Sequence, residues 1–325
     1  MVRFGYTLMT EQSGPRELVK QACAAERAGF DFAVMSDHYS PWLDAQGHSP
    51  YAWSVLGAVA QATERMDLMS FVTAPIMRYH PAVVAQKAAT VDLLSDNRFT
   101  LGVGAGENLN EHVVGRGWPP VNVRHEMLGE ALRIISALFE GGYVNFAGDH
   151  YRVDSATLWD LPEQRVPIAT AVSGEQSIEE CAPLADAMIA VQPEARLCQS
   201  WDSATGGGQR KYGQQPISWD PSAEAGAQRA WSKMRWFAGG WKVNAELPGT
   251  AAFAAATQHV RVEDVSAGIP CGPDVEPIVK SMSAYWEAGF TDIALVQVGV
   301  DENPNGFFGF ARERLLPALR EAAES

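Results

Sequence analysis

Short apolar runs alternate with stretches of helical periodicity along almost the whole chain. The first run, Arg3–Leu8, predicts a strand. The stretch 15–29 predicts a helix, because its apolar residues recur at helical spacing, with Pro15 near its start and Gly29 past its end. The same alternation predicts helices at 51–65, 81–95 and 124–141 and strands at 30–35, 68–72, 98–104, 166–172, 187–191, 215–220 and 293–299.

Most of these strands are nearly continuous apolar runs, as expected for a parallel sheet covered by helices. About eight such units predict an α/β fold, a (β/α)8 TIM barrel that forms a single domain over residues 1–325. The alternative doubly wound fold would need an early G-x-G-x-x-G, and the similar stretch Gly102–Glu107 has the wrong spacing. Three longer segments, about 143–165, 196–214 and 238–268, are expected as insertions after barrel strands.

Composition and charge narrow the class of protein. Hydrophobic residues make up 46% of the chain, and no apolar run approaches the ~18 residues of a membrane-spanning helix. The chain start lacks the pattern of a secretory signal, so a cytoplasmic location without membrane attachment is expected. The net charge of -14 argues against a nucleic-acid partner, because phosphate contacts need clustered Lys and Arg.

The cysteines and histidines show no metal-binding pattern. Cys23, Cys181, Cys198 and Cys271 are widely separated and form no C-x-x-C pair, which indicates reduced thiols. The sequence contains no H-E-x-x-H motif, and the adjacent Glu111 and His112 would point in different directions on a helix. No metal site is expected.

Polar groups follow the predicted strands where a barrel carries its active site, at the carboxyl ends. Asp37 and His38 follow the second strand, Glu107 and Asn110 follow the fourth, and the segment 173–177 follows the fifth. Each group also has a structural interpretation: His38 as a buried structural histidine, Asp37 as a turn cap, Ser173 as a helix cap, and Trp42 and Trp53 as core aromatics. Their collection at one end of the barrel favours a functional site.

Several segments resemble those of a known family: SDHYSPW (36–42), APIMRYHPAVVAQKAAT (74–90), NRFTLGVGAGENLNEH (97–112) and CGPDVEPIVKSMSAYWEAGFTDIALVQVG (271–299). Together they resemble the luciferase-like superfamily of (β/α)8 oxidoreductases, in particular its coenzyme F420-dependent branch, which includes F420-dependent glucose-6-phosphate dehydrogenase. The resemblance covers nearly the whole chain. It implies coenzyme F420 as the cofactor, a small-molecule substrate, and a homodimer.

The resemblance also implies roles for individual residues. His38 is similar to the general base that takes an alcohol proton, and Glu107 to the acid near the pyrimidine edge of the deazaflavin ring. Trp42 and Glu11 resemble active-site groups beside the substrate. The cofactor contacts implied are the bulge at Phe71, Val72 and Ala74, with a non-proline cis peptide at Phe71–Val72; Asp37 and Asn110; and Ser173, Gly174, Gln176 and Ser177 at the phosphate.

One departure from the resemblance concerns the substrate. The sugar-phosphate dehydrogenases grip the phosphate with basic residues, and here Glu194 and Ala267 occupy two of those positions, while Lys242 matches the third. Lys211 is another cation that could fill the role. We therefore expect hydride transfer between F420 and an alcohol or carbonyl carbon without a phosphate, with Trp201, Trp219, Trp236 and Trp241 as candidates for an apolar wall. Two alternatives remain: an FMN-dependent monooxygenase of the same superfamily, and a non-catalytic F420- or flavin-binding protein.

Overall fold

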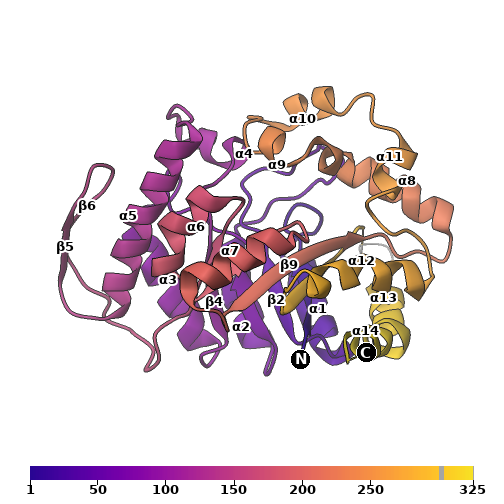
Figure 1. Cartoon of the computed structure of the whole chain (residues 1–325), viewed down its shortest axis with the longest axis horizontal. Helices are drawn as coiled ribbons and strands as arrows, with labels where there is room; N and C mark the ends of the chain where they lie inside the picture. The colour runs from indigo at the N-terminus through magenta and orange to yellow at the C-terminus, as the bar shows by residue number, and fades with distance from the viewer. Residues whose placement is uncertain (300–303, 325) are drawn as a thin grey trace.

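A closed barrel of eight parallel strands forms the centre of the molecule, as the computed structural model shows for residues 1–299 and 304–324 (Figure 1). The order around the barrel is β1-β10-β9-β8-β7-β4-β3-β2. The strands are β1 (Arg3–Leu8), β2 (Phe32–Met35), β3 (Asp67–Ser70), β4 (Phe99–Val103), β7 (Ile168–Ala171), β8 (Ala187–Ile189), β9 (Arg210–Ile217) and β10 (Asp292–Gln297). The predicted (β/α)8 TIM barrel is confirmed.

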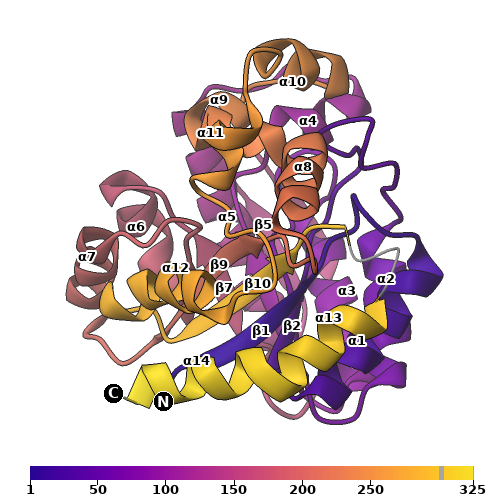
Figure 2. The ribbon, with the colours of Figure 1, turned by 90° about the vertical axis from the view of Figure 1, so that its right-hand side faces the viewer.

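Helices surround this barrel and also gather over one of its ends. The outer helices include α1 (Pro15–Ala28), α2 (Ala52–Ala62), α3 (Pro81–Leu94), α5 (Val121–Phe139), α6 (Glu175–Cys181), α7 (Ala195–Thr205), α12 (Val275–Glu287), α13 (Pro304–Phe310) and α14 (Leu316–Glu324). The helices α8 (Ala223–Met234), α9 (Trp241–Asn244), α10 (Thr250–Ala256) and α11 (Val262–Ser266) lie together beyond the carboxyl ends of the strands (Figure 2).

Local sequence explains why the main elements form where they do. Helix α1 has Pro15 in its first turn and ends at Gly29, whose φ of 98° closes the helix in the left-handed region. All six residues of β10 and all four of β2 are buried, in keeping with apolar runs inside a helix-covered barrel. At Gly102 of β4, a Cβ would lie 1.9 Å from the carbonyl oxygen of Ser70, so the approach of β3 to β4 requires glycine.

The three segments expected as insertions have different structures. Residues 143–165 contain an antiparallel hairpin, β5 (Val144–Ala147) and β6 (Arg152–Ala156), which follows helix α5 rather than a strand and projects beside it (Figure 1). Glu130 of α5 holds this hairpin by accepting the backbone N–H groups of Asp149, His150 and Tyr151. The segment 238–268 contains α9, α10 and α11.

The segment 196–214 differs from the expectation of an insertion. It holds most of α7 and the first half of β9, which begins at Arg210 and not at 215. Polar residues hid the strand in the sequence. Lys211 is buried, and its Nζ forms an ion pair with Asp202 Oδ1 at 2.8 Å. The ion pair allows a charged side chain to occupy a buried strand position, where the sequence pattern predicts an apolar residue.

Two features are absent from residues 1–299 and 304–324. No helix in these ranges is both long and apolar enough to cross a membrane. No group of three or more His, Cys, Asp or Glu in the same ranges is arranged to hold a metal ion. The four cysteines are free thiols, and burial raises the pKa of Cys181, Cys198 and Cys271 to about 11.

Candidate active site

Side chains from the ends of β1, β2 and β4 meet beneath α8–α11. His38 follows β2 and lies between two carboxylates. Its Nδ1 is 3.4 Å from Oε1 of Glu11, which follows β1, and its Nε2 is 3.6 Å from Oε2 of Glu107, which follows β4. The barrel thus brings together three polar residues that are far apart in the sequence.

The neighbours of His38 determine its tautomer. Besides Glu11 Oε1, the carbonyl oxygen of Ser40 lies 3.3 Å from Nδ1, and both are acceptors. Two acceptors at Nδ1 favour the tautomer of the neutral ring with the proton on that nitrogen, which leaves the lone pair on Nε2, the nitrogen that faces Glu107. The imidazole also contacts the indole of Trp42, with 5.0 Å between ring centroids.

Glu11 is buried and fixed by three donors. Its Oε2 accepts hydrogen bonds from Ser36 Oγ (2.5 Å) and Thr10 Oγ1 (3.1 Å), and its Oε1 accepts one from Trp42 Nε1 (3.2 Å). Because a carboxylate so held cannot rotate freely, Glu11 orients both Trp42 and His38.

Glu107 is a carboxyl group in a desolvated position. Burial raises the pKa of Glu107 to about 7, and the charges of Glu11 and Glu111 act in the same direction. His38 and Arg78 act in the opposite direction. Asn110 Nδ2 donates to Glu107 Oε2 at 3.2 Å. The group therefore exchanges its proton near neutral pH.

Asp37 and Asn110 are turned toward the protein. Asp37 Oδ2 accepts from Thr73 Oγ1 (2.8 Å) and Trp53 Nε1 (3.2 Å), and Oδ1 accepts from Tyr79 OH (3.2 Å). Asn110 Oδ1 accepts two backbone N–H groups of the loop after β2, at residues 39 and 40. Both residues hold the loops of the site in place through these contacts.

The backbone segments at the ends of β3, β4 and β7 approach one another closely. The Phe71–Val72 peptide is cis, which confirms the expectation from the resemblance. Gly104 faces this bulge: a Cβ there would lie 2.8 Å from Val72 Cγ2 and 3.3 Å from the Cβ of Ala171. Ala74 and Phe71 are buried beside it. Gly104 therefore packs directly against the Val72 side chain, and glycine is required for this close approach.

The segment 173–177 joins β7 to α6 at the same end of the barrel. The Ser177 hydroxyl accepts from the backbone N–H groups of Ser173 (3.1 Å) and Gly174 (3.2 Å) and donates to the Gly174 carbonyl (2.8 Å). Ser177 is buried, whereas Gln176 is exposed. Two backbone N–H groups of the expected phosphate position thus already have a partner inside the protein.

Of the four tryptophans proposed for an apolar wall, Trp236 lies at the site. Its ring stacks on Trp42 with centroids 4.2 Å apart and planes inclined by 11°, and Phe253 of α10 meets Trp42 edge-on at 5.0 Å. Trp201 is fully buried in α7, Trp219 stacks on Phe310, and Trp241 is exposed on α9. Trp42, Trp236 and Phe253 therefore pack together in one aromatic cluster, in which Trp42 and Phe253 are buried.

Sequence reasoning missed two buried charges of the site, Arg78 and Glu111. Arg78 Nη2 lies 3.3 Å from Asp37 Oδ1, and Arg78 Nε lies 3.4 Å from Glu111 Oε1. Both residues fall in segments that carry the resemblance, and Glu111 follows Glu107 by one helical turn. That spacing was the signal that could have singled out Glu111.

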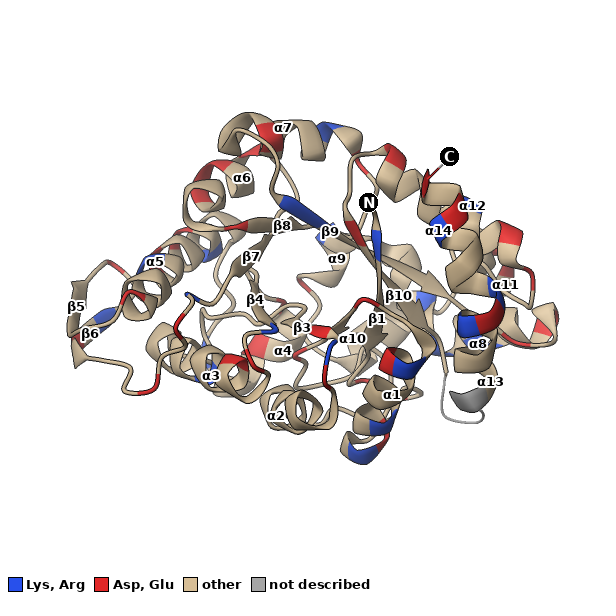
Figure 3. Cartoon of the chain, turned by 90° about the horizontal axis from the view of Figure 1, so that it is seen from below, with Lys and Arg blue, Asp and Glu red and all other residues tan. Residues whose placement is uncertain are grey.

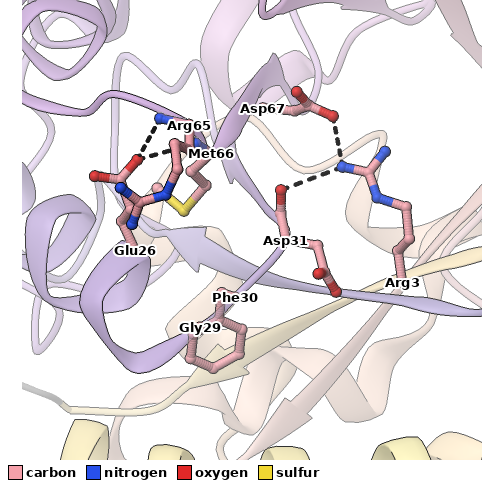
Figure 4. A pocket seen from close by; sticks show the side chains of 8 residues that line it. All are labelled: Arg3, Glu26, Gly29, Phe30, Asp31, Arg65, Met66 and Asp67. Atoms are coloured by element: carbon pink, nitrogen blue, oxygen red, sulfur yellow. Dashed lines mark hydrogen bonds and ion pairs between the residues drawn. The ribbon is translucent and has the colours of Figure 1, made fainter.

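A cleft of about 320 Å³ lies at the opposite end of the barrel, where the strands begin (Figure 4). In it, Arg3 at the start of β1 donates to Asp67 at the start of β3 (2.5 Å) and to the carbonyl of Asp31 (3.2 Å). Glu26 accepts the backbone N–H groups of Arg65 and Met66. The charges are paired with one another, which is typical of the stabilising face of a barrel.

Comparison with known proteins places the chain in a family. Residues 1–292 match the luciferase-like monooxygenase family, and the chain belongs to it. It is 32% identical to the F420-dependent glucose-6-phosphate dehydrogenase of Nakamurella multipartita, over 98% of this chain and 97% of the relative. The protein of the same name from Amycolatopsis mediterranei is 45% identical over 175 residues, 54% of this chain and 53% of that protein.

A solved structure is similar over the whole length. It is an F420-dependent secondary alcohol dehydrogenase in complex with an F420-acetone adduct. Its TM-score to this chain is 0.88 with 27% identity, and the match covers 98% of this chain and 99% of that one.

Proposed function

We propose that this protein is an F420-dependent oxidoreductase that transfers a hydride between the deazaflavin and an alcohol or carbonyl carbon. The observation that carries the proposal is the placement of His38, with Nε2 directed to Glu107 at 3.6 Å, at the barrel end that holds the Phe71–Val72 bulge. The names of the full-length relative and of the solved structure, both F420-dependent dehydrogenases, support the cofactor.

The residues present fit a flat ring at this position. Val72 is partly exposed at this end of the barrel, and its backbone is held against Gly104, where any Cβ would collide with the Val72 side chain. Glu107 supplies a carboxyl group that titrates near neutrality. These residues, with Ala74, would hold the ring, and the start of α6 would face the phosphate. When bound, the deazaflavin supplies the hydride acceptor.

His38 serves as the general base for the substrate hydroxyl. Its Nε2 lone pair accepts the O–H proton, and the imidazolium that results is stabilised by Glu11, 3.4 Å from Nδ1. Glu11 is itself held by Ser36, Thr10 and Trp42, so the ring keeps its orientation while its charge changes. In the reverse direction, the same nitrogen returns the proton to the carbonyl oxygen.

Glu107 holds or releases a proton on its carboxyl group, whose Oε2 accepts from Asn110 Nδ2. As a protonated acid it donates a hydrogen bond to a neighbouring group that gains negative charge, and its desolvation strengthens that interaction. The raised pKa of Glu107 keeps a substantial fraction of the group protonated at neutral pH.

The substrate proposed is a neutral, moderately apolar alcohol or ketone rather than a sugar phosphate. Trp42, Trp236 and Phe253 form an aromatic cluster beside His38. Lys211, a possible alternative phosphate ligand, is engaged by Asp202. Glu194 at the start of α7 adds negative charge where a phosphate would need a cation. These observations favour a substrate class different from the one in the names of the full-length relatives.

The test has two parts. Equilibrium titration of the purified protein with F420 and with FMN is expected to show tighter binding of F420; tight FMN binding without F420 binding would support the monooxygenase alternative. A kcat/KM panel of secondary alcohols, ketones and glucose 6-phosphate is expected to favour the neutral substrates. Preference for glucose 6-phosphate would overturn the substrate proposal, and binding without any turnover would support the non-catalytic alternative.

The same fold offers a surface for a second copy of the chain. Helices α2 and α3 expose only uncharged side chains along one face, the α2–α3 face: Ser54, Ala58, Gln61, Val83, Gln86, Thr90, Leu93 and Leu94. Helix α2 contains no charged residue at all (Figure 3). Since each copy carries a net charge of -14, two copies repel least where both are uncharged. We propose a homodimer through this face.

A further inference from the structure

A buried ion cluster lies next to His38 and Glu107, and none of its members takes a direct part in the proton transfer described above. It consists of Asp37, Arg78 and Glu111, whose side chains are 1%, 8% and 0% exposed. Burying charged groups costs free energy of desolvation, and well-defined contacts between the charges must offset that cost. A cation between two buried carboxylates is therefore a candidate for a functional role.

Arg78 bonds to both carboxylate residues, partly through the backbone. Its backbone N–H donates to Glu111 Oε2 at 2.7 Å, and its Nε lies 3.4 Å from Glu111 Oε1. Its Nη2 donates to the carbonyl oxygen of Asp37 at 2.7 Å and lies 3.3 Å from Asp37 Oδ1. The guanidinium therefore connects the loop after β2 with α4 (Asn108–Glu111).

Both connections lead directly to the reacting groups. The Asp37 carbonyl belongs to the peptide bond that precedes His38. Glu111 donates its backbone N–H to the Glu107 carbonyl at 3.1 Å. Its side chain also packs under the loop that carries Glu107, because a Cβ at Gly106 would lie 3.2 Å from Glu111 Cγ. Arg78 thus fixes two backbone segments at once.

We propose that Arg78, acting through Asp37 and Glu111, is a positioning residue that sets the placement of His38 relative to Glu107 and the charge that Glu107 faces. The inference rests on the proposed function for the roles of His38 and Glu107. It adds two buried residues, Arg78 and Glu111, that act through the placement of others.

The charges around Glu107 predict how its titration changes in variants of Arg78 and Glu111. His38 after β2 and Arg78 after β3 favour its carboxylate, whereas Glu11 after β1 and Glu111 on α4 disfavour it. Removing the charge of Glu111 and removing that of Arg78 must therefore move the titration of Glu107 in opposite directions. A general loosening of the site would move both in the same direction.

The experiment follows the carboxyl ¹³C signal of Glu107 by NMR in the cofactor-free protein, with the signal assigned from Glu107→Gln. Glu111→Gln is expected to lower the titration midpoint, and Arg78→Gln to raise it, each by roughly half a unit or more. Arg78→Lys keeps the charge and is expected to stay near the wild-type midpoint, while kcat falls about tenfold because Lys cannot make both sets of contacts.

Arg210→Gln is the control. Arg210 is a cation at the start of β9, at the opposite end of the barrel, where it lies 2.8 Å from Asp292 Oδ1, and its removal is expected to leave the Glu107 midpoint unchanged. Shifts in the same direction for Glu111→Gln and Arg78→Gln, or no shift for Glu111→Gln, would overturn the proposal. If Arg78→Gln does not fold, the Glu107 midpoint in Glu111→Gln and the midpoint and kcat of Arg78→Lys still test the proposal. Absence of F420 turnover in the wild type would reject the proposed function, whereas the NMR titration judges the positioning independently.

Discussion

The proton of His38 lies on Nδ1 because both neighbours of that nitrogen, Glu11 and the Ser40 carbonyl, are acceptors. With Nε2 as the base, His38→Ala is expected to lower kcat by ~10² to 10⁴-fold, the usual range for a lost general base, and to leave F420 affinity nearly unchanged. Steady-state kinetics and a cofactor titration of the variant measure the two effects. His112→Ala is the control, since that ring bonds only locally, 2.7 Å from the Asn108 carbonyl. If His38→Ala turns over substrate at the wild-type rate, His38 is not the general base.

The raised pKa of Glu107 has consequences for stability as well as for the reaction. Its pKa in the folded protein, about 7, exceeds the ordinary value of 4.5. The stability that it contributes is therefore fully present below about pH 4.5 and is lost as the pH rises through about 7. Glu107→Gln stays neutral throughout, so its free energy of unfolding should fall less than that of the wild type between pH 5 and pH 8. Denaturant titrations at both pH values test this. Equal pH dependence in the two proteins would mean that Glu107 does not titrate as described.

The identity of the central residues could be predicted from the sequence, whereas their partners could not. His38, Glu107, Glu11 and Trp42 stand at strand ends or in motifs, and the structure brings them together. The Arg78 cluster depends on contacts between loops that follow different strands, and no periodicity of the chain encodes such contacts. The sequence also could not show that the Asp37 and Asn110 side chains bond to other groups of the protein.

At the scale of elements, one connection ties α9 and its neighbours to the rest of the barrel. Glu246 accepts from Arg124 Nη2 and from Trp118 Nε1, each at 2.9 Å, and the carbonyl of Ala245 accepts the backbone N–H of Asn108 at 2.9 Å. Asn108 directly follows Glu107. The segment that covers the site is therefore tied to the backbone that carries the acid.

Glu246→Ala removes both side-chain bonds of this connection. The segment 241–257 is expected to exchange its backbone hydrogens about tenfold faster, since two bonds to a carboxylate that is half exposed contribute roughly 1 to 1.5 kcal/mol to local closure. KM should rise more than kcat falls. Hydrogen-exchange mass spectrometry with steady-state kinetics measures both, and Glu263→Ala on the exposed side of α11 is the control. Unchanged exchange in 241–257 would show that the segment is held by other contacts.

Elements with strong apolar periodicity could be predicted closely, and those with polar strands could not. Helix α1 and strand β1 lie where the pattern predicts them. The start of β9 was missed because Lys211 and its neighbours look polar until Asp202 pairs with the lysine. The β5–β6 hairpin was missed because its strands are short and half exposed, and it is held by Glu130 from another element.

At the scale of the whole molecule, the uncharged α2–α3 face gives a direct test of the homodimer. Ala58→Glu places a charge in the middle of this face, and two copies would bring two such charges together. The variant is expected to shift the protein from dimer to monomer in sedimentation or light-scattering measurements, with little change in its melting temperature. Gln199→Glu, which adds the same charge at an exposed position of α7, is the control. A monomeric wild type, or a variant that stays dimeric, would contradict the proposed interface.

The closure of the barrel affects how the chain folds during its synthesis. Strand β1 is bordered by β2, which follows it closely, and by β10, which ends at Gln297. On the ribosome, one edge of β1 therefore has no partner until almost the entire chain has emerged, roughly tens of seconds at ordinary rates of translation. An open strand edge is a template for pairing with other nascent chains. Synthesis of this protein thus exposes its first strand longest, and a chaperone that shields residues 3–8 would protect its yield.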